Sequence, residues 1–392
     1  MRGTLTHLEC ARCGLAHPSD RLQNLCACGA PLLARYDLAA VRELLPRERL
    51  AGRPPTLWRY RELLPAGPHE SPVTLGEGFT PLLPAGRLGA IAGLKNLYIK
   101  DESGNPTGSF KARGMTTAVT MALHRGARAL SLPSAGNAGS AAAACGARAG
   151  LPVHVFIPRD TPPLFALELE ALGAHVTLVE GVITDAGRVM QEAGRGQGWF
   201  DLSTLKEPYR VEGKKTMGYE LAEQFDWELP EVVLYPTGGG TGIVGMWKAF
   251  AELEELGWIG PRRPRLYSIQ ASGCAPIVAA FLAGQETAPP CVAPHTFISG
   301  LRVPRAIADF LILKALRESG GGAVAVSDEE ARAGWLELGR CEGLFAAPSG
   351  AAAWAGLKKL VERGEVRPDE RTVIFNTGTG LKYAESIHGA VA

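Results

Sequence analysis

The first residue with an evident chemical use is Lys111, which stands in a segment rich in Gly, Ser and Thr. Residues 100–114 read KDESGNPTGSFKARG and follow a short apolar run that is typical of a strand. We expect a helix to begin near Lys111. The positive end of a helix dipole disfavours an ammonium group and lowers the pKa of the amine. A neutral amine there can act as a nucleophile, although a solvated loop lysine is the alternative interpretation.

Two more segments have the composition of anion-binding turns. Residues 133–140 (PSAGNAGS) place Ser134, Gly136 and Asn137 before an Ala-rich helix, and residues 236–242 (PTGGGTG) place three successive glycines before another. Backbone N–H groups at a helix start can converge on a carboxylate in the first case and on a phosphate in the second. The glycine segment matches neither a P-loop nor a dinucleotide fingerprint. Ordinary capped turns are the alternative for both segments.

A fourth segment, residues 376–380 (NTGTG), follows the last predicted strand and offers hydroxyl groups, or else forms a simple turn. In open α/β sheets ligands bind at the carboxyl ends of strands, where all four segments are expected. A reactive lysine, a phosphate cradle, a carboxylate cradle and a pair of hydroxyls together suggest one cofactor, pyridoxal 5′-phosphate. Its aldehyde takes a lysine as a Schiff base, its phosphate needs N–H donors, and its ring needs polar partners.

The N-terminal segment carries two tight cysteine pairs, Cys10 with Cys13 and Cys26 with Cys28. This spacing can place four thiolates around one tetrahedral Zn²⁺, and four cysteines leave no open position, so we expect a structural metal. A segment of about 35 residues is too small to fold on apolar burial alone, so the metal would carry its folding. Two disulfides, four free thiols and a redox Cys-x-x-Cys are the alternatives.

The elements that must position these segments alternate from residue 97 onward. Short apolar runs are separated by Ala/Leu/Glu/Arg-rich stretches of helical length, which predicts βαβ units and mostly parallel sheets in an α/β fold. Because the runs are continuous rather than alternating, we expect sheets buried on both faces. The predicted strands are Leu97–Lys100, Ala129–Leu132, Val153–Ile157, Val176–Val179, Val232–Tyr235, Leu266–Ile269 and Thr372–Asn376.

The composition argues against nucleic-acid-binding, membrane-spanning and secreted proteins. The chain has 392 residues, 46% hydrophobic and 21% charged, with a formal net charge of +1. This balance gives no electrostatic case for nucleic acid or an anionic membrane as partner. With no long apolar stretch and no apolar segment near the start, we expect neither a transmembrane helix nor a secretory signal, and therefore a cytoplasmic protein.

Seven motifs in order resemble the fold-type II pyridoxal-phosphate enzymes, and within them the chain is most similar to the threonine synthase family. The resemblance covers about residues 75–383, and some family members also carry a short Cys-rich N-terminal extension. The motifs are LGEGFTPL (75–82), NPTGSFK (105–111), SAGN (134–137), YRVEGKKT (209–216), GGGTG (238–242), VSDEE (326–330) and TGTGLK (377–382).

The resemblance implies a fold of two open, twisted, mostly parallel sheets flanked by helices, with a small zinc-ribbon-like module added at the N-terminus. It also implies a substrate site between a large and a small domain, and a homodimer. The expected units are residues 1–36 for the module, 37–72 for a linker, 73–111 with 200–392 for the large cofactor-binding domain, and 112–199 for the small domain.

The resemblance also assigns roles to residues. Lys111 would carry the cofactor and act in catalysis, Asn137 would bond the phenolic oxygen, and Thr377 would face the ring nitrogen. The cofactor phosphate would be bound by Gly238, Gly239, Gly240, Thr241 and Gly242. The substrate would be bound by Lys100, Ser134, Gly136, Ala138 and Arg210.

The reaction implied is conversion of O-phospho-L-homoserine and water to L-threonine and phosphate. The chain departs from the family pattern at Ala112, Ala135 and Ala138, and its phosphate loop is richer in glycine than is usual. The glycine-only phosphate loop and Ala138 favour the runner-up, a threonine/serine ammonia-lyase or another β-replacement enzyme with a small amino-acid substrate. A non-catalytic zinc-binding scaffold is a third hypothesis, against which the intact Lys111 argues.

Overall fold

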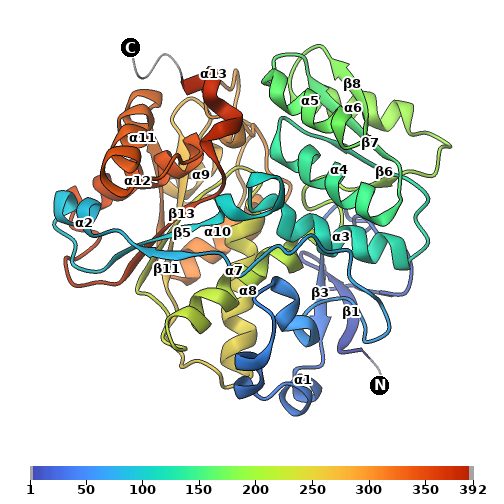
Figure 1. The fold of residues 1–392 in the computed structure, drawn as a ribbon, viewed down its shortest axis with the longest axis horizontal. Coiled ribbons are helices and arrows are strands. Elements are labelled where there is room, and N and C mark those ends of the chain that lie inside the picture. The colour runs from blue at the N-terminus through green and yellow to red at the C-terminus, as the bar shows by residue number, and fades with distance from the viewer. Residues whose placement is uncertain (1–2, 388–392) are drawn as a thin grey trace.

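The computed structural model describes residues 3–387 and contains two open α/β sheets side by side, each flanked by helices (Figure 1). The larger sheet has six strands in the order β12-β11-β10-β13-β5-β4, parallel except for the edge strand β4. Its strands are β4 (Leu82–Pro84), β5 (Leu97–Asp101), β10 (Val232–Pro236), β11 (Arg265–Ala271), β12 (Gly322–Val326) and β13 (Thr372–Asn376).

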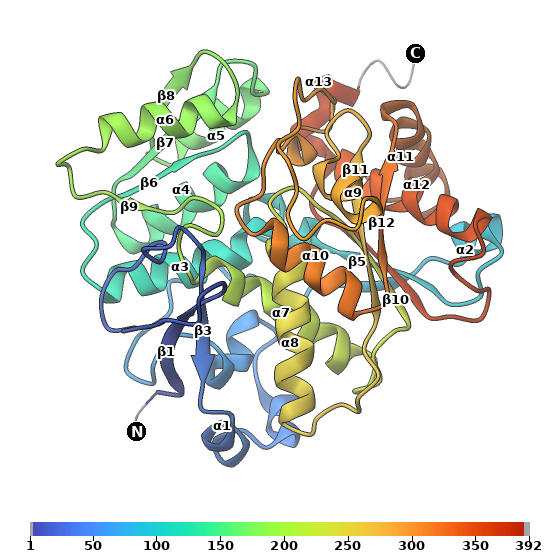
Figure 2. The ribbon, with the colours of Figure 1, turned by 180° about the vertical axis from the view of Figure 1, so that it is seen from behind.

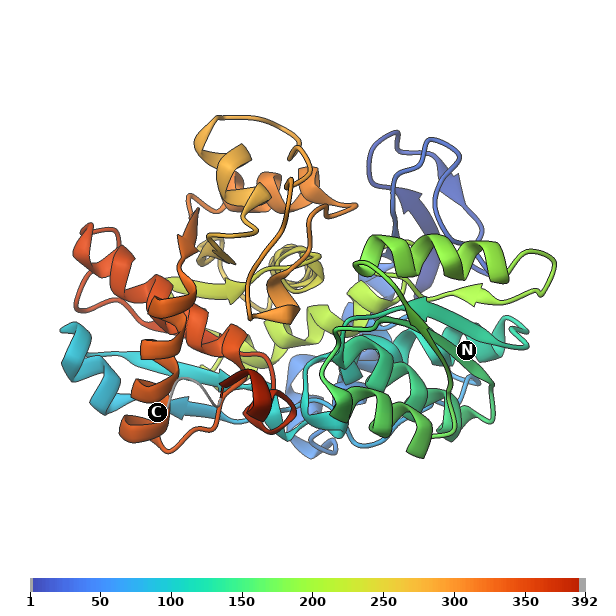
Figure 3. The same ribbon diagram turned by 90° about the horizontal axis from the view of Figure 1, so that it is seen from above.

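The smaller sheet has four parallel strands in the order β8-β7-β6-β9. Figure 3 shows it on the opposite side of the molecule from the larger sheet. Its strands are β6 (Leu130–Pro133), β7 (Val153–Pro158), β8 (His175–Val179) and β9 (Phe200–Asp201). The fold class predicted from the alternating pattern is therefore confirmed.

The N-terminal residues form a third, antiparallel sheet of β1 (Leu5–Cys10), β2 (Ala16–His17) and β3 (Leu32–Tyr36). It lies against α3, as Figure 2 shows. Buried residues of this sheet, among them Leu8 and Leu32, belong to the same apolar cluster as Met115 and Val119 of α3. Since the sheet shares a core with the rest of the chain, apolar burial adds to whatever a metal contributes to its folding.

Thirteen α-helices are described within residues 3–387. They are α1 (Leu38–Leu44), α2 (Gly86–Ala92), α3 (Lys111–His124), α4 (Asn137–Ala149), α5 (Pro163–Ala171), α6 (Ile183–Ala193), α7 (Arg210–Gln224), α8 (Thr241–Glu255), α9 (Pro276–Leu282), α10 (Asp309–Glu318), α11 (Asp328–Glu342), α12 (Pro348–Glu362) and α13 (Ala384–Ile387). In this described part of the chain, none has the length and apolarity needed to cross a bilayer.

Helix α7 is buried along almost its whole length although it carries many charges. Its charges are matched by neighbouring elements. Glu212 accepts a hydrogen bond from the Tyr36 hydroxyl at 2.7 Å and forms ion pairs with Lys215 at 2.7 Å and Lys248 at 3.0 Å. The Lys215 ammonium also lies 3.9 Å from the centre of the Tyr36 ring. Burial of these ions is tolerable because each has a close partner of opposite charge.

The structure differs from the expected units in two places. Phe200 and Asp201 form β9 of the smaller sheet rather than opening the large domain. Residues 37–72, expected as a linker, contribute Leu57, Tyr60 and Leu63 as fully buried side chains, so this segment is part of the packed body. Residues 1–2 and 388–392 of the expected first and last units lie outside the described residues.

Candidate active site

The candidate site is assembled where four strands end and three α-helices begin. Strands β5, β10 and β13 bring the Lys111 segment, the glycine loop and the 377 turn from the larger sheet, and β6 brings the Asn137 segment from the smaller one. Lys111, Asn137 and Thr241 are the first residues of α3, α4 and α8. The sequence predicts the helix start near Lys111 and a helix associated with each of the other two segments.

Backbone contacts fix the Lys111 segment against the 377 turn. The Phe110 N–H donates to the Thr377 carbonyl oxygen at 3.1 Å, and Ser109 pairs with Gly378 as an antiparallel bridge. The hydroxyls of Thr377 and Ser349 are 2.8 Å apart. The two segments are more than 260 residues apart in the sequence. The fold places them side by side, as expected from their positions at strand ends, whereas Ser349 was not expected here.

Aromatic side chains link the lysine to the glycine loop. The Lys111 ammonium lies 4.0 Å from the centre of the Phe110 ring, which meets Tyr235 edge-on with 5.9 Å between ring centres. Tyr235 is the residue of β10 just before the loop, and a side chain at Gly242 would overlap its ring. Lysine and loop therefore belong to one packed unit.

The glycine loop has the geometry of a phosphate cradle. Gly240 has a φ of +81°, and a Cβ there would overlap the Ile312 side chain; a Cβ on Gly239 would lie 2.7 Å from the Thr204 methyl carbon. The N–H groups of Gly238, Gly239 and Gly240 donate to no atom of the described residues. Free N–H groups at the start of α8 suit an anion, because the helix dipole adds to their positive charge.

Asn137 faces the site from the smaller sheet. Its Nδ2 donates to the Tyr383 hydroxyl at 2.8 Å, whereas its Oδ1 is buried without a partner. Burial raises the pKa of Tyr383 to about 12, so the phenol stays protonated at neutral pH. Sequence reasoning missed Tyr383 and Ser349, although Tyr383 directly follows the 377–382 motif. An unpartnered buried amide oxygen indicates a polar ligand group at this place.

The electrostatics favour a reactive amine at Lys111. Burial, and then the charge of Arg210, lowers the pKa of the Lys111 amine to about 7. Arg210 is itself buried; its Nη1 donates to the Leu202 carbonyl oxygen at 2.6 Å, and its Nε has no partner. Among residues 3–387 no carboxylate forms an ion pair with Lys111, with Arg210 or with the neighbouring Lys214. Glu207 and Asp201 act on the Arg210 charge but form no ion pair with its guanidinium. A ligand with negative charge can therefore pair with Arg210 here.

Comparison with known proteins now decides the family. The pyridoxal-phosphate-dependent enzyme family matches residues 73–378. The chain belongs to the pyridoxal-phosphate-dependent enzyme family. It is 37% identical to a threonine synthase of Methanosarcina acetivorans over 97% of this chain and 93% of that protein, and 37% identical to one of Methanocaldococcus jannaschii over 95% and 92%.

Solved structures agree on the fold. A threonine deaminase of Solanum lycopersicum superposes with a TM-score of 0.67 at 23% identity, over 79% of this chain and 86% of that one. A diaminopropionate ammonia lyase of Escherichia coli gives 0.68 at 19% identity, over 80% and 88%. These likenesses show the fold alone.

The residues present fit the cofactor of the pyridoxal-phosphate family. The glycine loop offers unused N–H groups, Asn137 has an unpartnered oxygen, and Lys111 has an amine of lowered pKa beside them. Thr377, on the turn after β13, carries a hydroxyl rather than a carboxylate. If this hydroxyl faced the ring nitrogen of the cofactor, it would not hold a proton there as a carboxylate would, and the ring would be a weaker electron sink.

Two residues expected to bind substrate are engaged elsewhere. The Lys100 ammonium is fully buried and donates to the Thr80 carbonyl oxygen at 2.7 Å, to Glu220 at 2.8 Å and to Gln224 at 2.8 Å. All three of its donors are used, so we do not carry Lys100 into a substrate role.

The Ser134 hydroxyl is likewise turned into its own loop. It donates to the Gly136 carbonyl oxygen at 2.9 Å and accepts from the N–H of Gly139 at 2.9 Å. Gly136 has a φ of +141°, where its missing side chain leaves room for the Phe165 ring at 3.1 Å. Ala138 is partly exposed at the start of α4. What this loop offers a substrate is therefore backbone rather than the serine hydroxyl.

The four N-terminal cysteines lie together away from this site. The Sγ atoms of Cys10 and Cys28 are 3.4 Å apart, those of Cys13 and Cys26 are 3.7 Å apart, and all four lie within 4.8 Å of one another. Tetrahedral bonds of about 2.3 Å to zinc would separate sulfurs by about 3.8 Å. The predicted cysteine cluster is thus present, with a size that fits one zinc ion.

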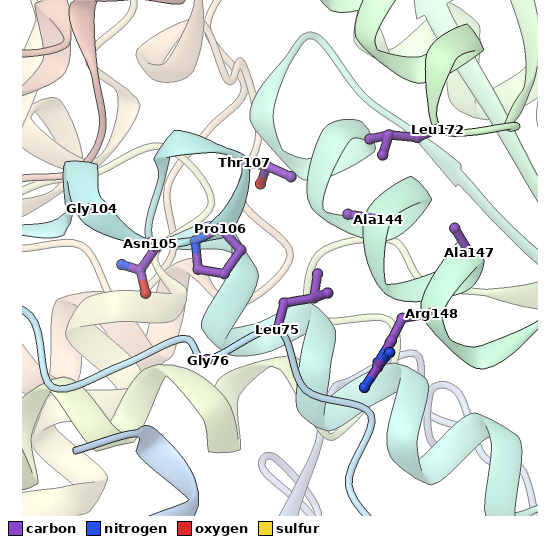
Figure 4. A pocket seen from close by; sticks show the side chains of 10 residues that line it. All are labelled: Leu75, Gly76, Gly104, Asn105, Pro106, Thr107, Ala144, Ala147, Arg148 and Leu172. Carbon is purple, nitrogen blue, oxygen red and sulfur yellow. The ribbon is translucent and has the colours of Figure 1, made fainter. Parts of the chain in front are cut away.

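A surface cavity of about 620 Å³ lies beside the loop that leads to Lys111 (Figure 4). Its lining is mostly apolar, with Arg148 from α4, and it contains none of the residues predicted for the active site. The lining residues are Leu75, Gly76, Gly104, Asn105, Pro106, Thr107, Ala144, Ala147, Arg148 and Leu172.

Proposed function

We propose that this chain is a threonine synthase, which converts O-phospho-L-homoserine and water to L-threonine and inorganic phosphate. The observation that carries the proposal is Arg210, a buried cation without a paired carboxylate whose charge reaches Lys111. The substrates of a threonine or serine deaminase have neutral side chains, so they would offer no anionic group to Arg210. A phosphate ester on the substrate would satisfy that charge, because guanidinium pairs well with phosphate.

In this proposal Lys111, Asn137, Thr377 and the glycine loop hold the cofactor. When bound, pyridoxal phosphate supplies an aldehyde for amino groups and a sink for electrons from carbon. The backbone N–H groups from Gly136 to Ala138 would receive the substrate carboxylate at the start of α4. Arg210 would orient the γ-phosphate, whose C–O bond breaks.

The role proposed for Lys111 is to move protons. An amine whose pKa is about 7 is half neutral at neutral pH, so it can take a proton from the substrate α-carbon and return one later in the reaction. Water supplies the hydroxyl that ends on the β-carbon, and phosphate leaves from the γ-carbon.

The test is a substrate panel on the purified holoenzyme. We expect equal amounts of phosphate and threonine from O-phosphohomoserine, and little ammonia from threonine or serine. Release of 2-oxobutyrate from threonine without phosphate release from O-phosphohomoserine would instead assign the chain as an ammonia-lyase. A panel in which no amino acid reacts, despite bound cofactor, would favour the scaffold hypothesis.

We also propose one structural zinc ion on Cys10, Cys13, Cys26 and Cys28. Support comes from their mutual distances and from Gly14 and Gly29, whose φ values of +72° and +81° turn the chain after each cysteine pair. Elemental analysis of the purified protein should give one zinc per chain. A metal-free protein with four reactive thiols, or with two disulfides, would reject the proposal.

By family resemblance alone we propose that the chain works as a cytoplasmic homodimer. Sedimentation equilibrium of the purified holoenzyme should give twice the chain mass of 41.5 kDa. A monomer at assay concentration would reject the dimer, and fractionation of the source cells tests the location.

A further inference from the structure

One side chain of the cysteine module reaches the segment that supports the candidate active site. Asn24 lies between the two cysteine pairs, two residues before Cys26. Its Nδ2 donates to the carbonyl oxygen of Asp201 at 2.9 Å and to that of Lys206 at 3.2 Å. Asn24 therefore bonds both ends of the loop 201–206 at once.

The loop has a shape that needs such support. Within it the Asp201 carboxylate accepts from the Ser203 N–H at 2.7 Å, which closes one turn. Leu205 has a φ of +58°, a left-handed conformation that is unfavourable for a residue with a branched side chain. Contacts within the loop, such as the Lys206–Asp201 ion pair at 3.5 Å, and contacts from outside it offset that strain.

This loop serves the site at two points. The Leu202 carbonyl oxygen accepts from the Arg210 guanidinium at 2.6 Å. The Thr204 methyl group packs where a side chain on Gly239 would stand, 2.7 Å from the position of its Cβ. One loop thus orients the buried cation and backs the glycine turn, so a displacement of the loop would disturb both.

We propose that Asn24 is a positioning residue that clamps the loop 201–206 and so couples the N-terminal cysteine module to the anion-binding half of the active site. The cysteines on either side fix the backbone around Asn24, so the metal proposed for them would set the position of the clamp. The expected effect on binding of O-phosphohomoserine rests on the proposed function, whereas the contact of Asn24 with the loop does not.

Hydrogen exchange of the loop tests the clamp without reference to activity. The variant Asn24→Ala loses both hydrogen bonds, and Asn24→Asp keeps the size of the side chain but has no donor. The matched control is Gln23→Ala, because the Gln23 amide reaches only the Pro18 carbonyl oxygen at 3.4 Å, inside the module. In the holoenzyme we expect amides of 201–206 to exchange roughly five to ten times faster in both Asn24 variants and unchanged in the control, as for the loss of one or two hydrogen bonds.

Two further measurements distinguish loss of the position of loop 201–206 from a general loss of stability in the Asn24 variants. For turnover of O-phosphohomoserine, we expect the Asn24 variants to raise KM about tenfold with kcat within about twofold, as for one lost charge-assisted contact. Removal of metal by a chelator should speed exchange of 201–206 in the wild type and add little in Asn24→Ala.

Exchange that is unchanged in Asn24→Ala, or that rises equally in Gln23→Ala, overturns the clamp. Chelation that leaves the loop unaffected overturns the coupling to the metal. If the loop responds as expected and no phosphate is released from O-phosphohomoserine, the clamp stands and the proposed function fails.

Discussion

Replacement of Arg210 by glutamine tests the proposed substrate most directly. Glutamine is polar and shorter, and it keeps a donor for the Leu202 carbonyl oxygen while it removes the charge. A hydrogen bond to a charged group contributes about 1.5–3 kcal/mol, and about 1.4 kcal/mol corresponds to a tenfold change. We therefore expect KM for O-phosphohomoserine to rise about 10- to 150-fold.

The same substitution should change the lysine. The Arg210 charge is one of the two causes that lower the pKa of Lys111 to about 7. Without that charge the pKa of the amine rises. The limb of the pH–rate profile that reports the free amine should therefore move to higher pH.

The matched control is Arg59→Gln. Arg59 is also buried, but it pairs with Glu223 at 2.6 Å, far from the candidate site. Its loss leaves an unpaired carboxylate and should lower the melting temperature, whereas loss of the unpaired Arg210 should lower it little or not at all. Steady-state kinetics and thermal melts of both variants make the comparison. A KM in Arg210→Gln within twofold of the wild type, or an equal rise in Arg59→Gln, would refute the reasoning.

Three other substitutions have defined outcomes. Lys111→Ala should abolish covalent attachment of pyridoxal phosphate, measured by borohydride trapping and mass spectrometry. In the wild-type apoenzyme the attachment rate should rise with pH through about 7, because the pKa of Lys111 in the folded protein lies well below that of an ordinary lysine. A midpoint near 10 would contradict this. Gly240→Ala should weaken cofactor affinity and lower the free energy of unfolding by about 2–4 kcal/mol, through backbone strain and overpacking. The control Gly364→Ala has a φ of +69° but open space around it, so it should lose only the backbone part, about 1–2 kcal/mol. Equal losses would show that the side chains around Gly240 leave room for a methyl group. Glu220→Gln should cost about 3–5 kcal/mol in urea unfolding because it leaves Arg113 undercompensated. Since paired cations lower the pKa of Glu220 to about 2, its contribution is complete above about pH 4.5 and is lost as the pH falls toward 2; stability that is flat across that range would contradict the pairing.

Much of the fold could be predicted because its strands are continuous apolar runs. All seven predicted strands are present, whereas β12 (Gly322–Val326) was missed because its sequence, GAVAV after two further glycines, resembles a turn as much as a strand. The cysteine module was predicted from spacing, but not its shared core with α3, because apolar residues in a short segment do not show what they pack against.

The candidate site could be predicted where a residue of suitable chemistry stands at the end of a predicted strand. The roles proposed for Lys111 and the glycine loop follow from local sequence, since both segments stand at a strand end before a helix. Lys100 has the same kind of position, yet its partner Glu220 is 120 residues away, and no local pattern shows that α7 lies across from it. Asn24 and Tyr383 were missed for the same reason.

The Tyr36 ring has a practical consequence for truncation. It covers Lys215 and bonds Glu212, two ions at the centre of the protein that belong to α7. A shortened chain that starts at residue 37 would leave a hole there and admit water to the ions. The N-terminal cysteine segment therefore forms part of the enzyme's buried core. A truncated protein must keep this segment, or the surface exposed by its removal must be redesigned.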